Sequence, residues 1–237
     1  MREIVFDLET TGFRYDEGHR IVEIGAIEMV RGAVTGKSFH TYVNPERDMP
    51  DGAYQVHGLS AEFLSDKPKF DDASVADAFL DFIGESRLVA HNGEKFDLPF
   101  LNAQLAGFDR PTIPGERLTD TLPLARRRFP GAPASLDALC SRFGIDTAER
   151  ERDGHGALLD SRLLATVYIE LTGGAQAGLS FSEDDEYGAT RRPRKPVKQR
   201  PTPLPSLISK EEAAAHEAFI ESLGPDSIWA KKRLADA

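Results

Sequence analysis

Two carboxylates, Asp7 and Glu9, stand two positions apart at the end of a short apolar run, within the segment D-L-E-T-T-G at 7–12. The run predicts a buried strand, and alternation along a strand sends both acids out of one face, about 7 Å apart. Like charges so placed are unfavourable unless a cation lies between them, and hard divalent cations prefer carboxylate oxygens. An isolated D-x-E pair more often begins a solvated turn, so its interpretation depends on the rest of the chain.

A second acidic position, Asp97, ends the segment H-N-G-E-K-F-D at 91–97. A short apolar strand is expected at 87–90 and a helix from about 95 to 106, which puts Asp97 in the first turn of that helix. The helix dipole stabilises an acid at that position, so a role for Asp97 in capping the helix is an alternative. We expect Asp97 at the carboxyl end of the sheet, where open sheets bind ligands.

The third segment, G-H-G-A-L-L-D at 154–160, contains His155 and Asp160. Glycines on both sides of His155 predict a loop residue that swings over a site, which Asp160 enters from the following helix. G-x-G before a helix is also half of a dinucleotide fingerprint. Leu159 replaces the third glycine and no strand precedes the loop, so that interpretation is weak.

Together the three segments resemble the motifs of the DEDDh family of 3′→5′ exonucleases, over residues 1–172. The resemblance implies an α/β, ribonuclease-H-like fold whose five-stranded mixed sheet is flanked by helices. It implies an acidic cluster of Asp7, Glu9, Asp97 and Asp160 around two divalent metal ions, Mg²⁺ or Mn²⁺. Asp97 would act mainly through water, and His155 would be the general base. Four carboxylates without a thiolate cluster also disfavour a structural zinc site.

Thr10 and Thr11 follow the first two acids, and their amides and hydroxyls are candidates to hold a terminal nucleotide. A simple turn is the alternative, equally good for Thr11. His57, in V-H-G-L at 56–59, resembles the family's substrate-side histidine. Cys140 lies in an i, i+3, i+4, i+7 apolar stripe with Leu136, so core packing explains it better than nucleophilic chemistry.

The elements that position these residues follow from periodicity. Strands are expected at 2–8, 20–30 and 37–43 with short glycine-containing links, which favours an antiparallel meander. Helices are expected at 73–83, 122–129, 135–143 and 157–171. Strands followed by strand–helix alternation predict a mixed sheet with helices on its faces.

The composition limits the class of protein. The 237 residues carry a net charge of −10, which counts against a protein that coats DNA through phosphate contacts alone. No apolar run is long enough to span a bilayer, and no secretory signal is expected. A single cysteine suits a reducing cytosol, so we expect a soluble, cytoplasmic protein.

The character of the sequence changes after residue 172. Residues 173–208 are rich in Gly, Pro and charge, which predicts a flexible linker between an exonuclease domain at 1–172 and a segment at 209–237. Within the linker, 176–181 is similar to the Q-x-x-L-x-F peptides of bacterial replication proteins that enter the β sliding clamp. Gln176, Leu179 and Phe181 would be the clamp-binding residues.

Order is expected to resume at Ser209, a plausible N-cap with Glu212 at N3, leading a helix to about 223. This segment resembles the tails that bind the α (polymerase) subunit of a bacterial replicase, and its contacts would be Phe219, Leu223 and Trp229. The resemblance therefore implies proofreading at a DNA 3′ end. Two alternatives stay open: a free-standing nuclease that trims RNA or oligonucleotide 3′ ends, and a module that mainly tethers polymerase to clamp.

Overall fold

The computed structural model describes residues 1–173, 208–224 and 227–228. Contacts within the chain divide it into two units, 1–181 and 182–237. The first unit contains one five-stranded sheet in the order β3-β2-β1-β4-β5. Its strands are β1 (Arg2–Thr10), β2 (Ile21–Val30), β3 (Ala33–Tyr42), β4 (Arg87–Ala90) and β5 (Leu118–Asp120).

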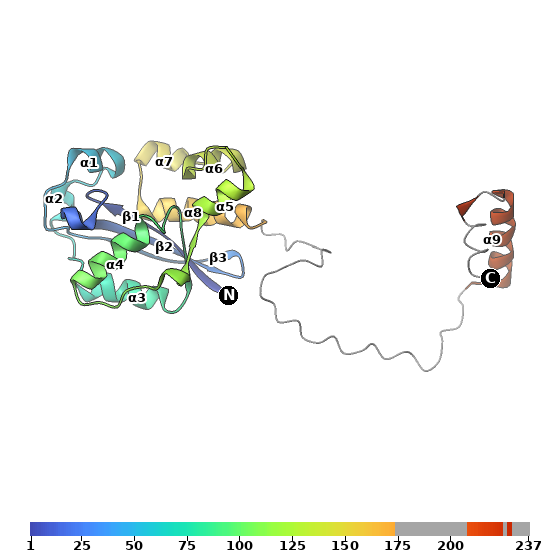
Figure 1. Cartoon of the computed structure of the whole chain (residues 1–237), viewed down its shortest axis with the longest axis horizontal. Helices are drawn as coiled ribbons and strands as arrows, with labels where there is room; N and C mark the ends of the chain where they lie inside the picture. The colour runs from blue at the N-terminus through green and yellow to red at the C-terminus, as the bar shows by residue number, and fades with distance from the viewer. Residues whose placement is uncertain (174–207, 225–226, 229–237) are drawn as a thin grey trace. The chain divides into compact units, whose positions relative to one another are not determined.

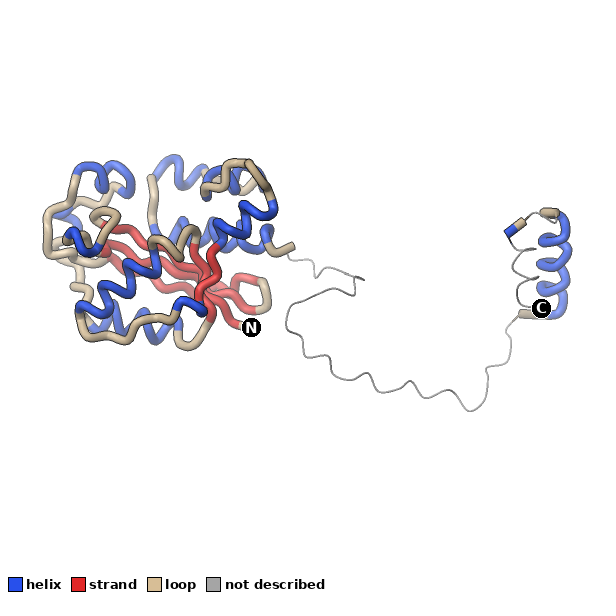
Figure 2. Tube along the Cα trace, viewed as in Figure 1, coloured by secondary structure: helices blue, strands red, loops and turns tan. Residues whose placement is uncertain are grey.

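The sheet is mixed, as the sequence predicts. β1, β2 and β3 form an antiparallel meander, whereas β4 and β5 run parallel to β1. The carboxyl ends of β1, β4 and β5 therefore meet at one edge of the sheet. In Figure 2 the strands form a single layer with helices around it.

Alternation along β1 divides the core into two faces. Ile4, Phe6 and Leu8 pack with residues of the segments leading to and forming α3 (Ala78–Ile83) and α4 (Asp97–Gly107). Val5 faces the other way and packs against α8 (Ala157–Leu171). Asp7 and Glu9 have the parity of Val5, so β1 presents both acids on the face that α8 covers. Figure 1 shows α8 and α3 on opposite sides of the strands.

Most of the helices lie where apolar periodicity predicts them. α5 (Thr121–Arg128), α6 (Leu136–Phe143) and α8 form a second small core, in which Cys140 is fully buried. Core packing of Cys140 is thus confirmed. The helix expected at 73–83 is interrupted, because Ala73–Asp77 forms a π-helical turn before α3 begins.

Several short elements were not expected from the sequence. These are α1 (Asp51–His57), α2 (Ala61–Leu64), α7 (Ala148–Asp153), the strand β5, and 3-10 turns at Tyr15–Glu17 and Gly115–Arg117. Each is too short for a periodic apolar pattern to be distinguished from chance.

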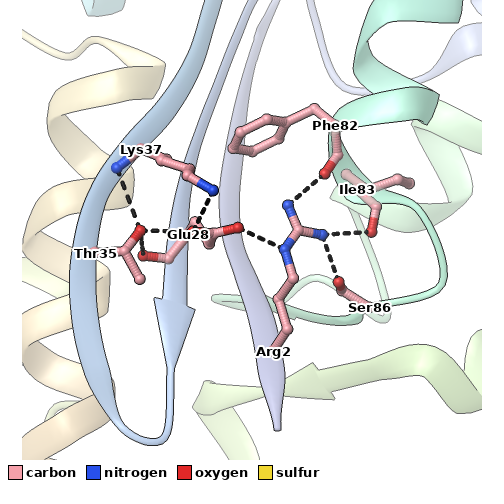
Figure 3. Close-up of polar contacts among 7 residues, drawn as sticks. All are labelled: Arg2, Glu28, Thr35, Lys37, Phe82, Ile83 and Ser86. Carbon is pink, nitrogen blue, oxygen red and sulfur yellow. Dashed lines mark hydrogen bonds and ion pairs between the residues drawn. The ribbon is translucent and has the colours of Figure 1, made fainter.

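At the end of the sheet remote from Asp7, Arg2 makes polar contacts with residues of β2 and of the end of α3 (Figure 3). The Arg2 guanidinium donates to the carbonyl oxygens of Phe82 and Ile83 at the end of α3, and to the Ser86 hydroxyl at 2.6 Å. Its Nε lies 2.6 Å from Oε1 of Glu28, a buried acid on β2. One arginine thus joins β1, β2 and the end of a helix.

In the second unit, α9 spans Lys210–Ser222. The Ser209 hydroxyl accepts from the Glu212 N–H, and the Glu212 carboxylate accepts from the Ser209 N–H, which together make a capping box. This confirms the expected start of the helix. Phe219 and Leu223 are exposed, and Trp229 lies outside the described residues.

Candidate active site

The first two acids lie on β1 beside β2. Asp7 is opposite Gly25 and Glu9 is opposite Glu23 in the antiparallel register. Both acids remain partly accessible to solvent. Gly25 has no side chain, so another element can approach β2 beside Asp7.

Asp160 reaches these acids from the first turn of α8 and is buried. The helix approaches because Gly25 has no side chain: a Cβ there would lie 2.2 Å from the carbonyl carbon of Ala157. The Ser161 hydroxyl also donates to the Gly25 carbonyl at 2.9 Å. The start of α8 is therefore seated directly on β2.

Asp97 is the first residue of α4 and is 2% exposed. The loop before it is held by Asp120, at the end of β5. The Asp120 carboxylate accepts from the N–H groups of Asn92 at 2.9 Å and Glu94 at 3.1 Å, and from Leu122 at the start of α5. Asp120 therefore fixes the turn that leads into Asp97.

The four predicted acids are close enough to perturb one another. Burial raises the pKa of Asp7 well above its usual value, and the charges of Asp97, Glu9 and Asp160 raise it further. Burial likewise raises the pKa of Glu9 to about 8 and that of Asp97 to about 7. Carboxylates gathered in a poorly solvated site retain protons unless cations offset their charge.

His155 lies in the loop before α8, after Gly154 with a φ of +82°. Its side chain is 41% exposed, and its Nδ1 is 3.3 Å from Oδ2 of Asp160. Ligand atoms of Glu9, His155 and Asp160 all lie within 4.8 Å of one another. The structure thus brings His155 to the acidic cluster, as the sequence predicts.

The donor set fits hard divalent cations. Asp7, Glu9, Asp97 and Asp160 offer only oxygen ligands, which Mg²⁺ and Mn²⁺ prefer. Oδ1 of Asp160 is buried and accepts no well-aligned hydrogen bond, although Nε of Arg150 lies 2.7 Å from it. A buried carboxylate oxygen in that state is suited to a metal ligand.

A cavity of about 370 Å³ adjoins the acids, and its walls are largely apolar. Glu9, Thr10, Thr11 and His57 line it together. Thr10 and Thr11 also serve the turn: the Thr10 hydroxyl donates to the Gly12 carbonyl at 2.6 Å. His57 is buried, and its Nε2 has no hydrogen-bond partner.

Three polar residues of the site were missed by sequence reasoning. Glu23 is a buried acid on β2 whose Oε1 is 2.7 Å from Nε2 of His40. Asp120 organises the Asp97 loop, and Arg150 on α7 pairs with Asp160. Glu23 interrupts an apolar strand, so the sequence alone could have marked it as a candidate site residue. Arg150 lies in a charged stretch, where no pattern distinguishes it from its neighbours.

Gln176, Leu179 and Phe181 lie outside the described residues, so the clamp-binding prediction stays a prediction. Within the part of the chain that the structure describes, no helix has the length and apolarity to cross a bilayer.

Comparison with known proteins identifies the class first. A family model described as Exonuclease (RNase_T) matches residues 4–168, so the chain belongs to the exonuclease family. The fold resembles that of Exonuclease X solved with 5′-overhanging duplex DNA, with a TM-score of 0.53 and 26% identity over 72% of this chain and 90% of that one. A structure of Exonuclease I shares the fold, with a TM-score of 0.60 and 17% identity over 72% of this chain and 40% of that one.

Relatives define the subfamily. The protein named DNA polymerase III subunit epsilon from Rickettsia prowazekii is 48% identical to this chain over 227 residues, which cover 94% of this chain and 97% of the relative. The protein of that name from Escherichia coli is 40% identical over 242 residues, covering 96% and 97%. Within the exonuclease family, the chain is thus a member of the DNA polymerase III epsilon subunits.

Proposed function

We propose that this chain proofreads DNA synthesis in a bacterial cytoplasm as the 3′→5′ exonuclease of DNA polymerase III. It would release nucleoside 5′-monophosphates from a single-stranded or frayed primer terminus. The observation that carries the proposal is the convergence of four acids from β1, α4 and α8 beside a cavity suited to a nucleotide. The epsilon relatives support it over almost their whole length.

Asp7, Glu9 and Asp160 would hold two divalent ions, and Asp97 would complete the site. When bound, such ions polarise the scissile phosphodiester, assist the attack of water and stabilise the 3′-oxygen leaving group. The chain's own task is to fix the carboxylates: β1 orients two of them, and α8, seated on Gly25, orients the third.

His155 would accept the proton of the attacking water. Its exposed ring, on a glycine-flanked loop, lies within reach of both the acids and solvent. A neutral imidazole nitrogen is a suitable base near neutral pH.

Thr10, Thr11 and His57 would position the terminal nucleotide in the adjoining cavity. Selection against a mismatch need not involve base reading, because a mispaired end unpairs at a lower free-energy cost and enters a single-strand site more often.

The rest of the chain would connect the nuclease to the replicase. Exposed Phe219 and Leu223 on and after α9, with Trp229, are the proposed contacts to the α subunit of DNA polymerase III. Gln176, Leu179 and Phe181 are the proposed contacts to the β sliding clamp. The domain division at 172 and 208 belongs to this proposal.

The deciding experiment uses the full-length protein and a primer–template whose 3′-terminal nucleotide is labelled and is either matched or mismatched. We expect Mg²⁺- or Mn²⁺-dependent release of mononucleotides, faster from the mismatch, and no release by Asp7→Asn or in EDTA. Activity on RNA exceeding that on DNA would favour a free-standing trimming nuclease. Absence of any metal-dependent cleavage would leave only the tethering module.

Partner binding is tested separately by pull-down with the α subunit. Phe219→Asp should lose the α subunit, whereas Glu221→Gln, a change at an exposed position on the same helix, should retain it. Equal capture by both variants would remove the proposed role of Phe219.

A further inference from the structure

A buried arginine stands among the groups of the active site. Arg150 is carried by α7, and only 9% of its side chain is exposed. Its Nε lies 2.7 Å from Oδ1 of Asp160, and its Nη2 donates to Oδ2 at 2.9 Å. The same Nη2 is 2.8 Å from Nδ1 of His155. Arg150 therefore touches both a proposed metal ligand and the proposed base.

This placement needs an electrostatic explanation. A buried charge is retained only where it is paired, and the site presents an excess of carboxylates. The positive charge of Arg150 acts on both Glu9 and Asp160 and opposes the repulsion from the other acids. The guanidinium thus supplies some of the charge that divalent ions would supply.

A second partner is available to the same guanidinium. Nη1 of Arg150 forms an ion pair with Asp137, at the start of α6, whose side chain is 68% exposed. A cavity of about 510 Å³ lies between α6 and α7 and is lined by Asp137, Ser141, Thr147, Arg150 and His155. The Arg150 side chain thus has both adjoining space and a counter-charge other than Asp160.

We infer that Arg150 is a counter-cation that holds Asp160 and the His155 ring in the metal-free protein, and that it releases Asp160 and keeps only its pairing with Asp137 when divalent ions enter. The inference depends on the proposed metal site. A guanidinium within 3 Å of Asp160 and a divalent ion on the same carboxylate repel each other, so the two compete. Arg150 is a positioning residue in this scheme, because it acts through Asp160 and His155.

The scheme predicts opposite effects on two measurable properties. Arg150→Gln removes the competing charge, so Mn²⁺ should bind at least about tenfold more tightly. The same change leaves the carboxylates of the metal-free protein without their counter-charge, so its melting temperature in EDTA should fall. A residue with only a packing role would lower the melting temperature without tightening Mn²⁺ binding.

The test is calorimetric titration of the full-length protein with Mn²⁺, together with melting curves in EDTA. Arg127→Gln, an exposed arginine on α5, is the matched control for net charge and should behave as the wild type. Arg150→Lys keeps the charge and should stay close to the wild type in EDTA. Unchanged Mn²⁺ affinity in Arg150→Gln, or equal tightening in Arg127→Gln, would overturn the inference.

Two further outcomes are distinguishable. If Arg150→Gln folds only when Mn²⁺ is present, the metal is replacing the missing charge, which supports the inference. If it folds in neither condition, Asp137→Asn decides: loss of the alternative partner should weaken Mn²⁺ binding several-fold, and unchanged binding would overturn the scheme. A wild-type protein that binds no Mn²⁺ would instead contradict the proposed metal site itself.

Discussion

Gly25 on β2 and Ala157 at the start of α8 are in backbone-to-backbone contact, with no room for a side chain between them. A Cβ at position 25 would lie 2.2 Å from the Ala157 carbonyl carbon and from the Leu158 nitrogen. Since Gly25 is also the strand partner of Asp7, this contact sets how closely Asp160 approaches the acids of β1. The spacing of the carboxylates therefore depends on a residue that carries no functional group.

Gly25→Ala should move α8 away from the sheet, because the atoms in its path belong to the backbone and cannot rotate aside. We expect the free energy of unfolding to fall by about 1–3 kcal/mol, as in other overpacked sites. Nuclease activity should fall much further, since a displacement near 1 Å in a catalytic site can reduce the rate about a hundredfold. Melting curves and a primer-degradation assay measure the two effects.

Gly115→Ala is the matched control, because a Cβ at position 115 meets nothing within 4 Å. It should change neither property. A Gly25→Ala protein with wild-type activity would show that the approach of α8 does not set the geometry of the acids.

Asp120 should matter for metal binding and stability although it is not one of the predicted metal ligands. Asp120→Ala removes the acceptor for three backbone N–H groups, including those of Asn92 and Glu94, so the loop before Asp97 loses its anchor. We expect weaker Mn²⁺ binding and a loss of about 1–3 kcal/mol in stability. Asp120→Asn retains the Oδ1 acceptor and should recover part of both, whereas equal damage by the two variants would indicate a role for the charge itself.

His155→Ala tests the general base. The proton of the attacking water would pass to solvent without assistance, so kcat should fall by about 10²–10⁴ while Mn²⁺ affinity and KM change little. Rate profiles against pH are the sharper measurement, because the variant should lose the fall in rate at acidic pH that protonation of the base causes in the wild type. A variant with full activity would remove the base assignment.

The metal-free protein should become less stable as pH rises. Burial raises the pKa of Glu9 from 4.5 to about 8, so the folded state binds more protons than the unfolded state between these values. Stability from this group is fully present below about pH 4.5 and is lost as pH rises through about 8. Melting temperatures in EDTA between about pH 5 and about pH 8 measure the effect, and excess Mn²⁺ should offset it.

Two histidines act in the opposite direction, since partial or full burial lowers the pKa of His91 and His57. Glu9→Gln isolates the acid: it keeps both histidines, so its melting temperature should fall less with pH than that of the wild type. Parallel curves for the two proteins would show that Glu9 does not titrate in this range.

The sequence was most informative where a residue's role depends on local spacing. Asp7, Glu9 and Asp160 were placed from strand alternation and from position in a helical turn, and both patterns survive folding because they are backbone geometry. The strands β1 and β2 and the helices α6 and α8 were found because each has an apolar face long enough to show a period.

What remained hidden depends on contacts between distant segments. No local pattern connects Asp120 with the loop at 92–94, or Arg150 with Asp160, because each pair forms only after the strands and helices have assembled. The role of Gly25 could not be predicted either, because a glycine within a strand does not indicate which backbone segment will pack against it.

Arg2 should contribute stability without contributing to catalysis. Arg2→Met keeps the apolar stem but removes the side-chain donor to the Phe82 and Ile83 carbonyls at the end of α3, and the hydrogen bond that chiefly lowers the pKa of Glu28. We expect the free energy of unfolding at neutral pH to fall by about 2–4 kcal/mol, because a buried acid loses its main partner. Arg2 and Asp7 are five residues apart on one strand, about 17 Å, so kcat should stay at the wild-type value.

Arg87→Met is the control, because Arg87 lies at the same end of the sheet and makes a 3.3 Å contact with Thr119; this variant should lose little stability. Chemical denaturation of the three proteins measures the difference, and a stability loss no larger in Arg2→Met than in Arg87→Met would show that the network in Figure 3 does not hold the sheet to α3.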